Sequence, residues 1–426
     1  MTEQRIFRLL DRLGPGPGRA GFQVPGRVEV LGKHTDYAGG RSLLCATARG
    51  FAVAVGRRDD DRIHVIDSCS NQLLDLSAGS ASGHRPRWAL YPETVLRRAR
   101  SDFSASVPGC SILLRSDLPS AAGLSSSSAL MIGIFLALDA VARFSRTAAF
   151  QAAIRSRTDL AAYLASVERG SPFPGLGKLD HDQESGVGTR GGGQDHTAIL
   201  CAEAGRLVRY AFEPPRREAT LSVPTGWTFA IGASGVRASK AGGARDRYNR
   251  LSDLARQAAE RWRSATGRQE PHLGAIATAG PGAMTQLQDI LAGESDPGRH
   301  DALQARVSHF VAESEEIVPD AHAALTAGDM PAFGELVDRS QALAEQLLGN
   351  QVPQTAWLAG RARRLGAAAA SAFGAGFGGS VWALVPDESS SDFLRRWRDA
   401  YHAAHGRKRR TAWFTTDAAA PARQVV

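Results

Sequence analysis

The feature that most restricts the fold is a glycine- and serine-rich turn at residues 118–128. It follows an apolar, strand-like segment at 111–115 and leads into a helical pattern at 129–141. Gly123 lets the backbone approach an anion closely, and the serines place unpaired N–H groups at a helix N-terminus, where the dipole favours negative charge. These residues alone fit a phosphate-binding loop and a multiply capped helix equally well. No G-x-x-x-x-G-K-[ST] sequence occurs, so the turn is not a Walker A loop.

Strand and helix patterns fall into two unequal parts along the chain. In the first part we expect strands at 28–31, 51–55, 63–66, 111–115, 198–201 and 206–210, and helices at 129–141 and 147–168. In the second part we expect helices at 244–265, 300–327, 331–348 and 354–370, followed by a strand at 380–385. The proline-broken polar stretch at 213–218 is the expected boundary. We therefore predict an α+β protein with an N-terminal domain at 1–215 and a C-terminal domain at 216–426.

Three further segments combine glycine with polar or charged side chains. Residues 25–40 present a dense polar set after a short strand, as a solvated turn also would. Residues 191–196 form a glycine run that ends in Asp195, a carboxylate that fits either a buried cap or a group aimed at a substrate hydroxyl. The run from Gly374 to Gly379 formally matches the dinucleotide-binding fingerprint. It leads into a strand instead of opening a helix, so NAD binding is not predicted.

Composition argues against several classes of protein. The net charge is +8, but almost every basic residue is arginine, and the one dense cluster, at 407–410, has no interleaved aromatic residues. A nucleic-acid partner is therefore not expected. The four cysteines are widely spaced and form no C-x-x-C pair, which argues against a disulfide framework and a zinc site. Without a long apolar run or a signal-peptide pattern, we expect a cytoplasmic protein with no membrane partner.

Taken together, the four glycine-containing segments resemble motifs of the GHMP kinase superfamily, and of its galactokinase branch in particular. Residues 25–40 resemble the galactokinase signature, typically G-R-V-N-L-I-G-E-H-T-D-Y-N-G-G. Residues 118–130 resemble the superfamily's phosphate loop, and 374–379 its C-terminal glycine loop. The resemblance covers about residues 21–386. It implies an N-terminal domain of ribosomal-protein-S5-like topology and a ferredoxin-like C-terminal domain, with the active site between them.

The resemblance also implies roles for residues that match the motifs. Asp195 would face the sugar hydroxyl that attacks ATP, and Arg27 would lie beside that hydroxyl and the γ-phosphate. Ser126 or Ser127 would help to bind Mg²⁺ and phosphate, with Ser127 as the expected ligand, and Glu168 would bind Mg²⁺. The implied sugar-binding residues are Lys33, His34, Asp36, Gly193 and Tyr248. The implied ATP-binding residues are Gly123, Leu124, Ser125, Ser126, Ser127, Ser128, Gly376 and Gly378. Phosphoryl transfer depends on positioning and charge neutralisation, which such a set supplies.

The chain departs from the family's motif at Lys33, where galactokinases carry a Glu expected to accept a hydrogen bond from the sugar's C6 hydroxyl. An ammonium group has three donors and no acceptor, so the exchange inverts the local chemistry. One explanation is a substrate with an anion at that end, such as a uronic acid. The other is that Lys33 pairs with Asp36 or Glu29, or points to solvent, while a neutral sugar still binds.

A second departure lies in the loop that precedes Asp195. This loop is longer than in the family, and its inserted residues include the string Asp180-His181-Asp182-Gln183-Glu184. The string resembles a set of metal ligands, although a solvated loop is the commoner origin of such a pattern. Glu184 is therefore an alternative to Glu168 as the Mg²⁺ ligand.

We expect an ATP- and Mg²⁺-dependent monosaccharide 1-kinase of galactose metabolism, with galactose as the first substrate to test. The alternatives are a kinase for a sugar acid such as galacturonate and a catalytically silent regulator that binds sugar and ATP. Retention of Arg27, Asp195 and the serines together argues against the regulator. A nucleic-acid-binding protein is the weakest alternative. The expected partners are a small-molecule sugar and ATP, and the expected state is a monomer or weak dimer.

Overall fold

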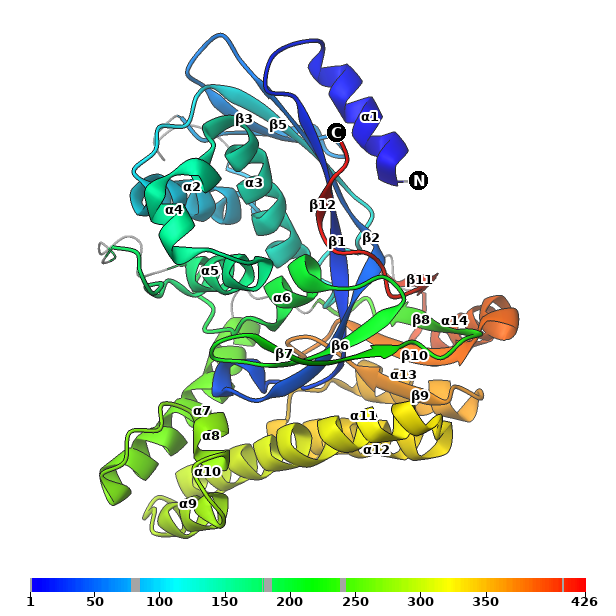
Figure 1. The fold of residues 1–426 in the computed structure, drawn as a ribbon. Coiled ribbons are helices and arrows are strands. Elements are labelled where there is room, and N and C mark those ends of the chain that lie inside the picture. The colour runs from blue at the N-terminus through cyan, green and yellow to red at the C-terminus, as the bar shows by residue number, and fades with distance from the viewer. Residues whose placement is uncertain (1, 78–84, 178, 180–185, 238–242, 408–409) are drawn as a thin grey trace.

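The computed structural model describes residues 2–77, 85–177, 179, 186–237, 243–407 and 410–426 (Figure 1). Within these ranges the chain forms an eight-stranded sheet and a four-stranded sheet, each accompanied by helices. The α+β class expected from the sequence is confirmed. Across these same residues, no helix combines the length and the apolar character that a membrane span requires.

The larger sheet has the strand order β12-β1-β2-β5-β3-β4, and β6 pairs with β2 and with β7. Its strands are β1 (Ala20–Leu31), β2 (Arg41–Arg57), β3 (Ile63–Asp67), β4 (Gln72–Asp75), β5 (Cys110–Ser116), β6 (Arg206–Ala211), β7 (Arg216–Ser222) and β12 (Arg423–Gln424). The smaller sheet has the order β11-β8-β10-β9. Its strands are β8 (Trp227–Ala233), β9 (Ala369–Ala372), β10 (Ser380–Pro386) and β11 (Ala412–Thr416).

Helices flank both sheets, and the two long helices α11 and α12 run side by side beneath the smaller sheet in the view of Figure 1. The helices of the first half are α1 (Thr2–Leu13), α2 (Leu90–Phe103), α3 (Ser126–Ala142), α4 (Ala148–Ala153), α5 (Arg157–Arg169) and α6 (Gln194–Cys201). Those of the second half are α7 (Gly243–Thr266), α8 (Leu273–Ala277), α9 (Ala283–Ala292), α10 (Pro297–Phe310), α11 (Val318–Ala327), α12 (Met330–Leu343), α13 (Pro353–Arg364) and α14 (Ser390–His405). Two π-helical turns, Val311–Ile317 and Ala344–Leu348, extend the α10–α11 and α12 segments.

The strand β1 carries the signature segment through the middle of the molecule. It pairs on one side with β2 and on the other with β12, and nearly all of its residues are buried. The β1–β2 register shifts between Pro25 and Arg27 and again between Glu29 and Leu31. Such irregularities bend a strand and re-aim its side chains, and they are common beside active sites. Here they bracket the segment that bears Arg27 and Glu29.

Most of the expected elements are confirmed, and the differences have local causes. The expected strand at 198–201 is wrong, because these apolar residues form the buried end of α6. The expected helix at 147–168 is two helices, separated where Ser156 caps the start of α5 by accepting a hydrogen bond from the Asp159 N–H. The helix expected at 354–370 ends at Arg364, and β9 begins at Ala369.

The predicted domain boundary at residue 215 stays a prediction. Two strands that follow it, β7 and β12, pair within the larger sheet, so the end of the chain returns to the first half.

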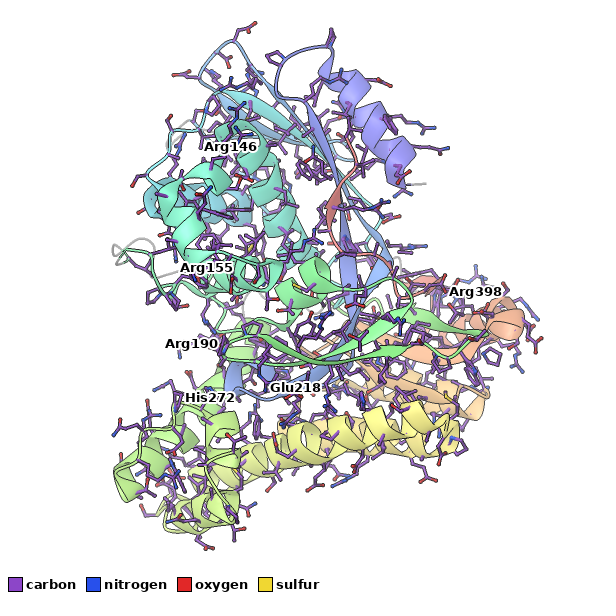
Figure 2. All side chains as sticks on the ribbon, viewed as in Figure 1. Arg146, Arg155, Arg190, Glu218, His272 and Arg398 are labelled. Carbon is purple, nitrogen blue, oxygen red and sulfur yellow. The ribbon has the colours of Figure 1, made fainter. Side chains whose placement is uncertain are left out.

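The arginines that dominate the charge are dispersed, with Arg155 and Arg398 on opposite sides of the molecule (Figure 2).

Candidate active site

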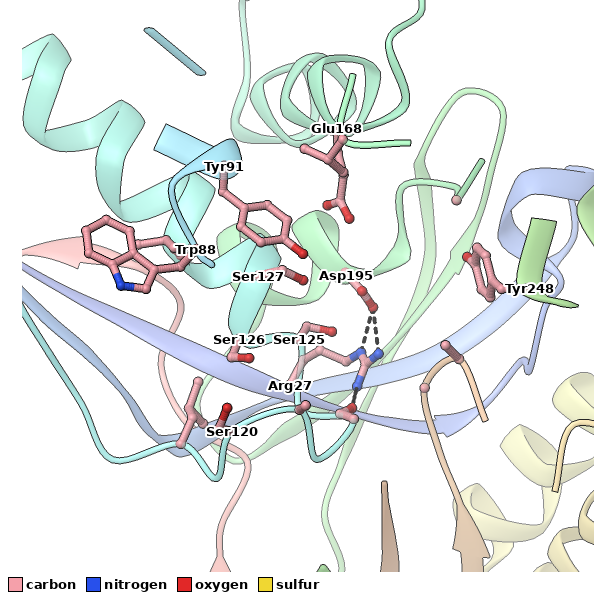
Figure 3. A pocket seen from close by; sticks show the side chains of 18 of the residues that line it. Arg27, Trp88, Tyr91, Ser120, Ser125, Ser126, Ser127, Glu168, Asp195 and Tyr248 are labelled. Atoms are coloured by element: carbon pink, nitrogen blue, oxygen red, sulfur yellow. Dashed lines mark hydrogen bonds and ion pairs between the residues drawn. The ribbon is translucent and has the colours of Figure 1, made fainter. Parts of the chain in front are cut away.

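A cavity of about 740 Å³ collects residues from the signature segment, the serine turn, the glycine loop before α6 and the C-terminal glycine loop. These segments are far apart in sequence. Figure 3 shows the cavity with Trp88 and Tyr91 on one side, Tyr248 on the other, and Arg27 and Asp195 between them. The four glycine-containing segments singled out in the sequence therefore meet around one cavity.

An ion pair between Arg27 and Asp195 lies at the centre of this cavity (Figure 3). Arg27 Nε donates a hydrogen bond to Asp195 Oδ1 over 2.8 Å, and Nη2 lies 2.7 Å from the same oxygen in an ion pair. The guanidinium group also donates through Nη1 to the carbonyl oxygen of Gly123, and its Cζ lies 5.8 Å from the ring centroid of Phe373. Asp195 stands in the first turn of α6, where the helix dipole stabilises a negative charge. Contacts among β1, α6 and the serine turn therefore hold the Arg27–Asp195 pair in place.

The serine turn enters α3 through left-handed residues that include Gly123 and Ser125. Gly123 has φ +80° and Ser125 has φ +56°, which brings Ser125, Ser126 and Ser127 to the cavity (Figure 3). The Arg27 backbone N–H donates to the Leu124 carbonyl oxygen over 3.3 Å, which ties the turn to β1. A turn of this form offers N–H groups and hydroxyls at a helix N-terminus, an arrangement that binds phosphate.

The C-terminal glycine loop packs directly on the serine turn. A Cβ atom added at Gly374, whose φ is +81°, would lie 2.9 Å from the Gly123 carbonyl oxygen and 3.3 Å from Arg27 Nη2. Gly374 and Ala375 line the cavity. Any larger side chain at residue 374 would push the serine turn away from Arg27.

A carboxylate and a hydroxyl suited to Mg²⁺ face the same cavity. Glu168, in the last turn of α5, and Ser127 both line it. Glu168 accepts a hydrogen bond from Ser128 Oγ over 2.9 Å, and its Oε2 lies 3.4 Å from His196 Nε2. Mg²⁺ is usually held by one or two protein oxygens together with substrate phosphates, so this donor set fits the ion. Glu184, the alternative ligand, lies outside the described residues.

The rings of His34 and Tyr248 line the cavity at the end opposite Trp88, and Tyr37 packs against both of them. The ring of Tyr248 lies 5.1 Å from that of His34 and 6.1 Å from that of Tyr37. His34 is hydrogen-bonded through Nδ1 to the Tyr37 hydroxyl and through Nε2 to the Ala375 carbonyl oxygen. Burial, reinforced by the charge of Arg306, lowers the pKa of His34 to about 3, so the ring is neutral.

The carboxyl group of Asp36 is the polar group beside this aromatic wall. Its Oδ2 accepts the backbone N–H of Gln194 over 3.1 Å, whereas its buried Oδ1 has no hydrogen-bond partner among the described residues. Burial raises the pKa of Asp36 to about 6, although the Gln194 N–H partly opposes the shift. A buried acceptor of this kind is suited to a sugar hydroxyl.

Lys33 does not line the cavity. Its side chain is almost completely buried, and Nζ donates to Ser340 Oγ on α12 over 2.8 Å. Ser340 Oγ in turn donates to Glu313 Oε1 over 3.0 Å, and the same oxygen accepts the backbone N–H groups of Gly32 and Lys33. The ammonium group thus faces the C-terminal helices instead of the cavity.

Three sequence profiles match this chain. The galactokinase galactose-binding signature matches residues 13–57, the GHMP kinase N-terminal domain matches 91–172, and the GHMP kinase C-terminal domain matches 321–403. The resemblance to the galactokinase branch of the GHMP kinase superfamily is therefore confirmed. The three matched ranges include the signature segment, the serine turn and the C-terminal glycine loop.

Curated relatives and solved structures agree with this assignment to the GHMP kinase superfamily. The chain is 26% identical to the galactokinase of Exiguobacterium sibiricum, with 95% of this chain and 94% of that one aligned. It is 27% identical to the galactokinase of Streptomyces coelicolor, over 90% and 89% of the two chains. The fold is similar to that of Lactococcus lactis galactokinase complexed with galactose, with a TM-score of 0.77, 20% identity and 99% coverage of both chains. It is also similar to Methanococcus jannaschii mevalonate kinase, with a TM-score of 0.57, 14% identity, and 95% of this chain and 99% of that one covered.

The structure brings most of the expected galactokinase-type residues into one cavity. The expected residues that line it are Arg27, His34, Asp36, Gly123, Ser125, Ser126, Ser127, Glu168, Asp195 and Tyr248. Leu124 and Ser128 support it from behind, through the contacts to Arg27 and Glu168 given above, and Gly193 is the N-cap residue of α6. Gly376 packs on Asn350 and Gly378 on Val236, so both stabilise the glycine loop, while Gly374 and Ala375 face the cavity.

Sequence reasoning missed the aromatic end of the cavity. Tyr91 lies in the first turn of α2, Trp88 lies just before this helix, and both line the cavity, with the Tyr91 side chain pointing toward Ser127 (Figure 3). Their spacing of three residues at the start of a helical pattern was the available signal, but the same pattern is typical of core packing. Only the folded chain shows that they face the cavity.

Proposed function

We propose that this chain is an ATP-dependent sugar 1-kinase that transfers the γ-phosphate of ATP to the anomeric hydroxyl of galactose or a closely similar neutral sugar. The observation that carries the proposal is the Arg27–Asp195 ion pair, held beside the serine turn in one cavity. The relatives named galactokinase support the choice of sugar.

In the reaction, the sugar hydroxyl oxygen forms a bond to the γ-phosphorus while the bond from that phosphorus to the ADP oxygen breaks. Asp195 orients the hydroxyl and accepts its proton, as a carboxylate within reach of the nucleophile does in general base catalysis. Arg27 neutralises the charge that develops on the transferred group. Because Arg27 also holds the Gly123 carbonyl oxygen, it keeps the serine turn in register with Asp195.

The two ends of the cavity suit the two substrates. Trp88 and Tyr91 offer aromatic faces for the adenine ring, next to the serine turn that would bind the phosphates. His34, Asp36 and Tyr248 offer a buried acceptor and ring faces for the sugar. These groups are suited to hydroxyls and C–H faces of a neutral sugar.

We further propose that Ser127 and Glu168 hold Mg²⁺ together with the phosphates of ATP. When bound, the ion neutralises phosphate charge and helps to orient the γ-phosphate. The cytoplasmic location, the monomeric or weakly dimeric state and the domain boundary at residue 215 stay predictions.

The position of Lys33 favours a neutral sugar over a uronic acid. Its ammonium group is turned to Ser340 and does not face the cavity, so it offers no cation to a sugar carboxylate. Retention of Arg27 and Asp195 as a formed pair disfavours the silent regulator.

The experiment that tests the proposal is ADP release with ATP and Mg²⁺ against galactose, glucose, arabinose, galacturonate and glucuronate. Asp195→Asn serves as the control, because it keeps the volume and removes the charge. We expect turnover with galactose that is lost in the variant. Turnover with a uronic acid alone would contradict the neutral-sugar assignment, and turnover with none of these sugars while ATP still binds would contradict the kinase assignment.

A further inference from the structure

A second carboxyl group lies beside the reaction centre and has no part in the mechanism above. Glu29 is fully buried on β1, two residues after Arg27. The register with β2 is regular from Arg27 to Glu29, so both side chains lie on the same face of the strand. Glu29 Oε2 accepts a hydrogen bond from Gln194 Nε2 over 2.5 Å, whereas Oε1 has no hydrogen-bond partner among the residues that the structure describes. Burying a polar atom without a partner is costly, which calls for an explanation.

Gln194 connects Glu29 to Asp195. It directly precedes Asp195 in the first turn of α6, and its side chain is fixed at both ends. Gln194 Oε1 accepts from Ser42 Oγ over 3.1 Å, while its backbone N–H donates to Asp36 Oδ2. Any movement of the Gln194 side chain is therefore passed on to the peptide unit that carries Asp195.

The two residues depart from the family's motifs together. Glu29 stands at the Asn of the signature quoted above. Galactokinases typically carry a G-x-M-D-Q core around the carboxylate that corresponds to Asp195; it reads Gly192-Gly193-Gln194-Asp195-His196 here, so Gln194 stands at its Met. An amide donor facing a carboxyl acceptor is a matched polar pair, and either residue alone would leave a buried polar group without a partner. A specific contact between residues 29 and 194 requires both residues to differ from the family's motifs, as they do here.

We propose that Glu29 is a positioning residue that acts through Gln194 to hold Asp195 in register with Arg27. This inference rests on the proposed kinase function for its kinetic consequences but not for the contact itself. The contact anchors the N-terminal turn of α6 to the strand that carries Arg27, so both partners of the central ion pair share one rigid support.

The charges around Glu29 give the proposal a pH signature. Arg27 on the same strand and Lys33 after it favour the ionised form, whereas Asp195 on α6 and Asp36 oppose it; β2 contributes the uncharged Ser42 and Leu44. Burial outweighs these charges and raises the pKa of Glu29 to about 7. Below this pH Glu29 is protonated and neutral, so the Arg27–Asp195 ion pair has no negative charge from Glu29 beside it. Above it, a second anion competes for Arg27, and we expect kcat to fall.

The experiment compares Glu29→Gln, Glu29→Asn, Gln194→Met and the double variant Glu29→Asn/Gln194→Met with the wild-type chain, from about pH 6 to about pH 8.5. Glu29→Gln keeps the acceptor for Gln194 but cannot ionise. We expect its kcat at low pH to lie within about twofold of wild type and its fall in kcat above about pH 7 to disappear.

The single variants Glu29→Asn and Gln194→Met misplace Asp195, so we expect kcat about 10- to 100-fold lower with the KM for ATP unchanged. The double variant restores the Asn and Met of the family's motifs together, and is expected to recover part of that loss.

One control variant separates positioning from general damage. Asp102→Asn alters another buried carboxylate, paired with Arg98 over 3.0 Å on α2, and is expected to lower thermal stability without changing the pH profile of kcat. Equal kcat in Glu29→Asn and wild type at every pH, or an unchanged pH profile in Glu29→Gln, would overturn the inference.

A second readout does not depend on turnover. The ¹³C NMR titration of the Asp195 carboxyl group is expected to show an inflection near pH 7 in the wild-type chain, because Glu29 ionises beside it, and none in Glu29→Gln. Absence of turnover in the wild-type chain would contradict the proposed function, while this titration would still decide the role of Glu29. The same inflection in both chains, or in neither, would overturn the inference.

Discussion

Removing the charge of Lys33 is predicted to destabilise the protein, not to change its choice of sugar. The ammonium group and the Glu313 carboxylate both bond to Ser340 Oγ, over 2.8 Å and 3.0 Å, at a site that is sealed from water. They are therefore at most about 6 Å apart, and at an effective dielectric constant of about 20 their attraction is about 3 kcal/mol. Breaking a buried pair by removing one partner typically costs about 3–5 kcal/mol.

We expect Lys33→Met to lower the free energy of unfolding by about 3 kcal/mol, since it leaves Glu313 buried without its cation. Lys33→Glu places a second anion beside Glu313 and is expected to cost several kcal/mol more, enough to unfold a protein of ordinary stability. Urea unfolding followed by tryptophan fluorescence measures both. The matched control is Arg62→Met, which breaks an exposed ion pair with Asp75 and should cost less than about 1 kcal/mol.

The reasoning is refuted if Lys33→Met unfolds within about 0.5 kcal/mol of the wild-type chain, which is the range of ordinary surface changes. It is equally refuted if Lys33→Glu is well folded and switches the preferred substrate from galacturonate to galactose. That second result would mean that residue 33 faces the sugar.

Three further perturbations test other parts of the account. Trp88→Ala is expected to raise the KM for ATP about 10-fold, because loss of a stacking face costs about 1–3 kcal/mol, while the KM for galactose stays unchanged. Gly374→Ala places a Cβ 2.9 Å from the Gly123 carbonyl oxygen in a left-handed conformation, so we expect lower thermal stability and lower kcat together. The raised pKa values of Glu29, about 7, and Asp36, about 6, mean that the native state binds these protons more tightly than the unfolded state. Their contribution to stability is complete below about pH 4 and is lost as pH rises to about 7, so the stability of Glu29→Gln relative to wild type should rise by about 3 kcal/mol over that window in urea titrations.

The local patterns predicted much of the fold. The serine turn and the apolar run after it predicted α3, because serine is common at helix starts and a continuous apolar pattern favours a helix. In the structure, however, the N-cap residue Ser125 makes no side-chain capping hydrogen bond. The apolar run at 198–201 led to the wrong prediction of a strand. Four apolar residues are too few to show a period, and they fit a strand or a buried helix end equally well.

The two central residues of the site could also be predicted from the sequence, because they match the family's motifs. Arg27 and Asp195 are 168 positions apart, and only the resemblance indicated that they meet. The orientation of Lys33 was not accessible, because its partner Ser340 is 307 positions away and belongs to a helix with no motif. Side-chain direction between segments far apart in sequence depends on packing that no local pattern records.

The contact between Glu29 and Gln194 illustrates the same limit. Each residue reads as an isolated departure from a motif, and a buried Glu cannot be told from an exposed one in the sequence. Only when β1 and α6 are placed together does the pair become a hydrogen bond between matched groups. The two substitutions are then one feature of the site.

The central claim is that the Arg27–Asp195 pair directs the γ-phosphate of ATP to the anomeric hydroxyl of a neutral sugar. The most direct measurement is ³¹P NMR of the products formed from ATP, Mg²⁺ and galactose by the wild-type chain and by Asp195→Asn. The account predicts a sugar phosphate esterified at the anomeric oxygen in step with ADP, and formation slower by a factor of about 10²–10⁴ in Asp195→Asn. Phosphate on another hydroxyl, or undiminished product formation in Asp195→Asn, would contradict it.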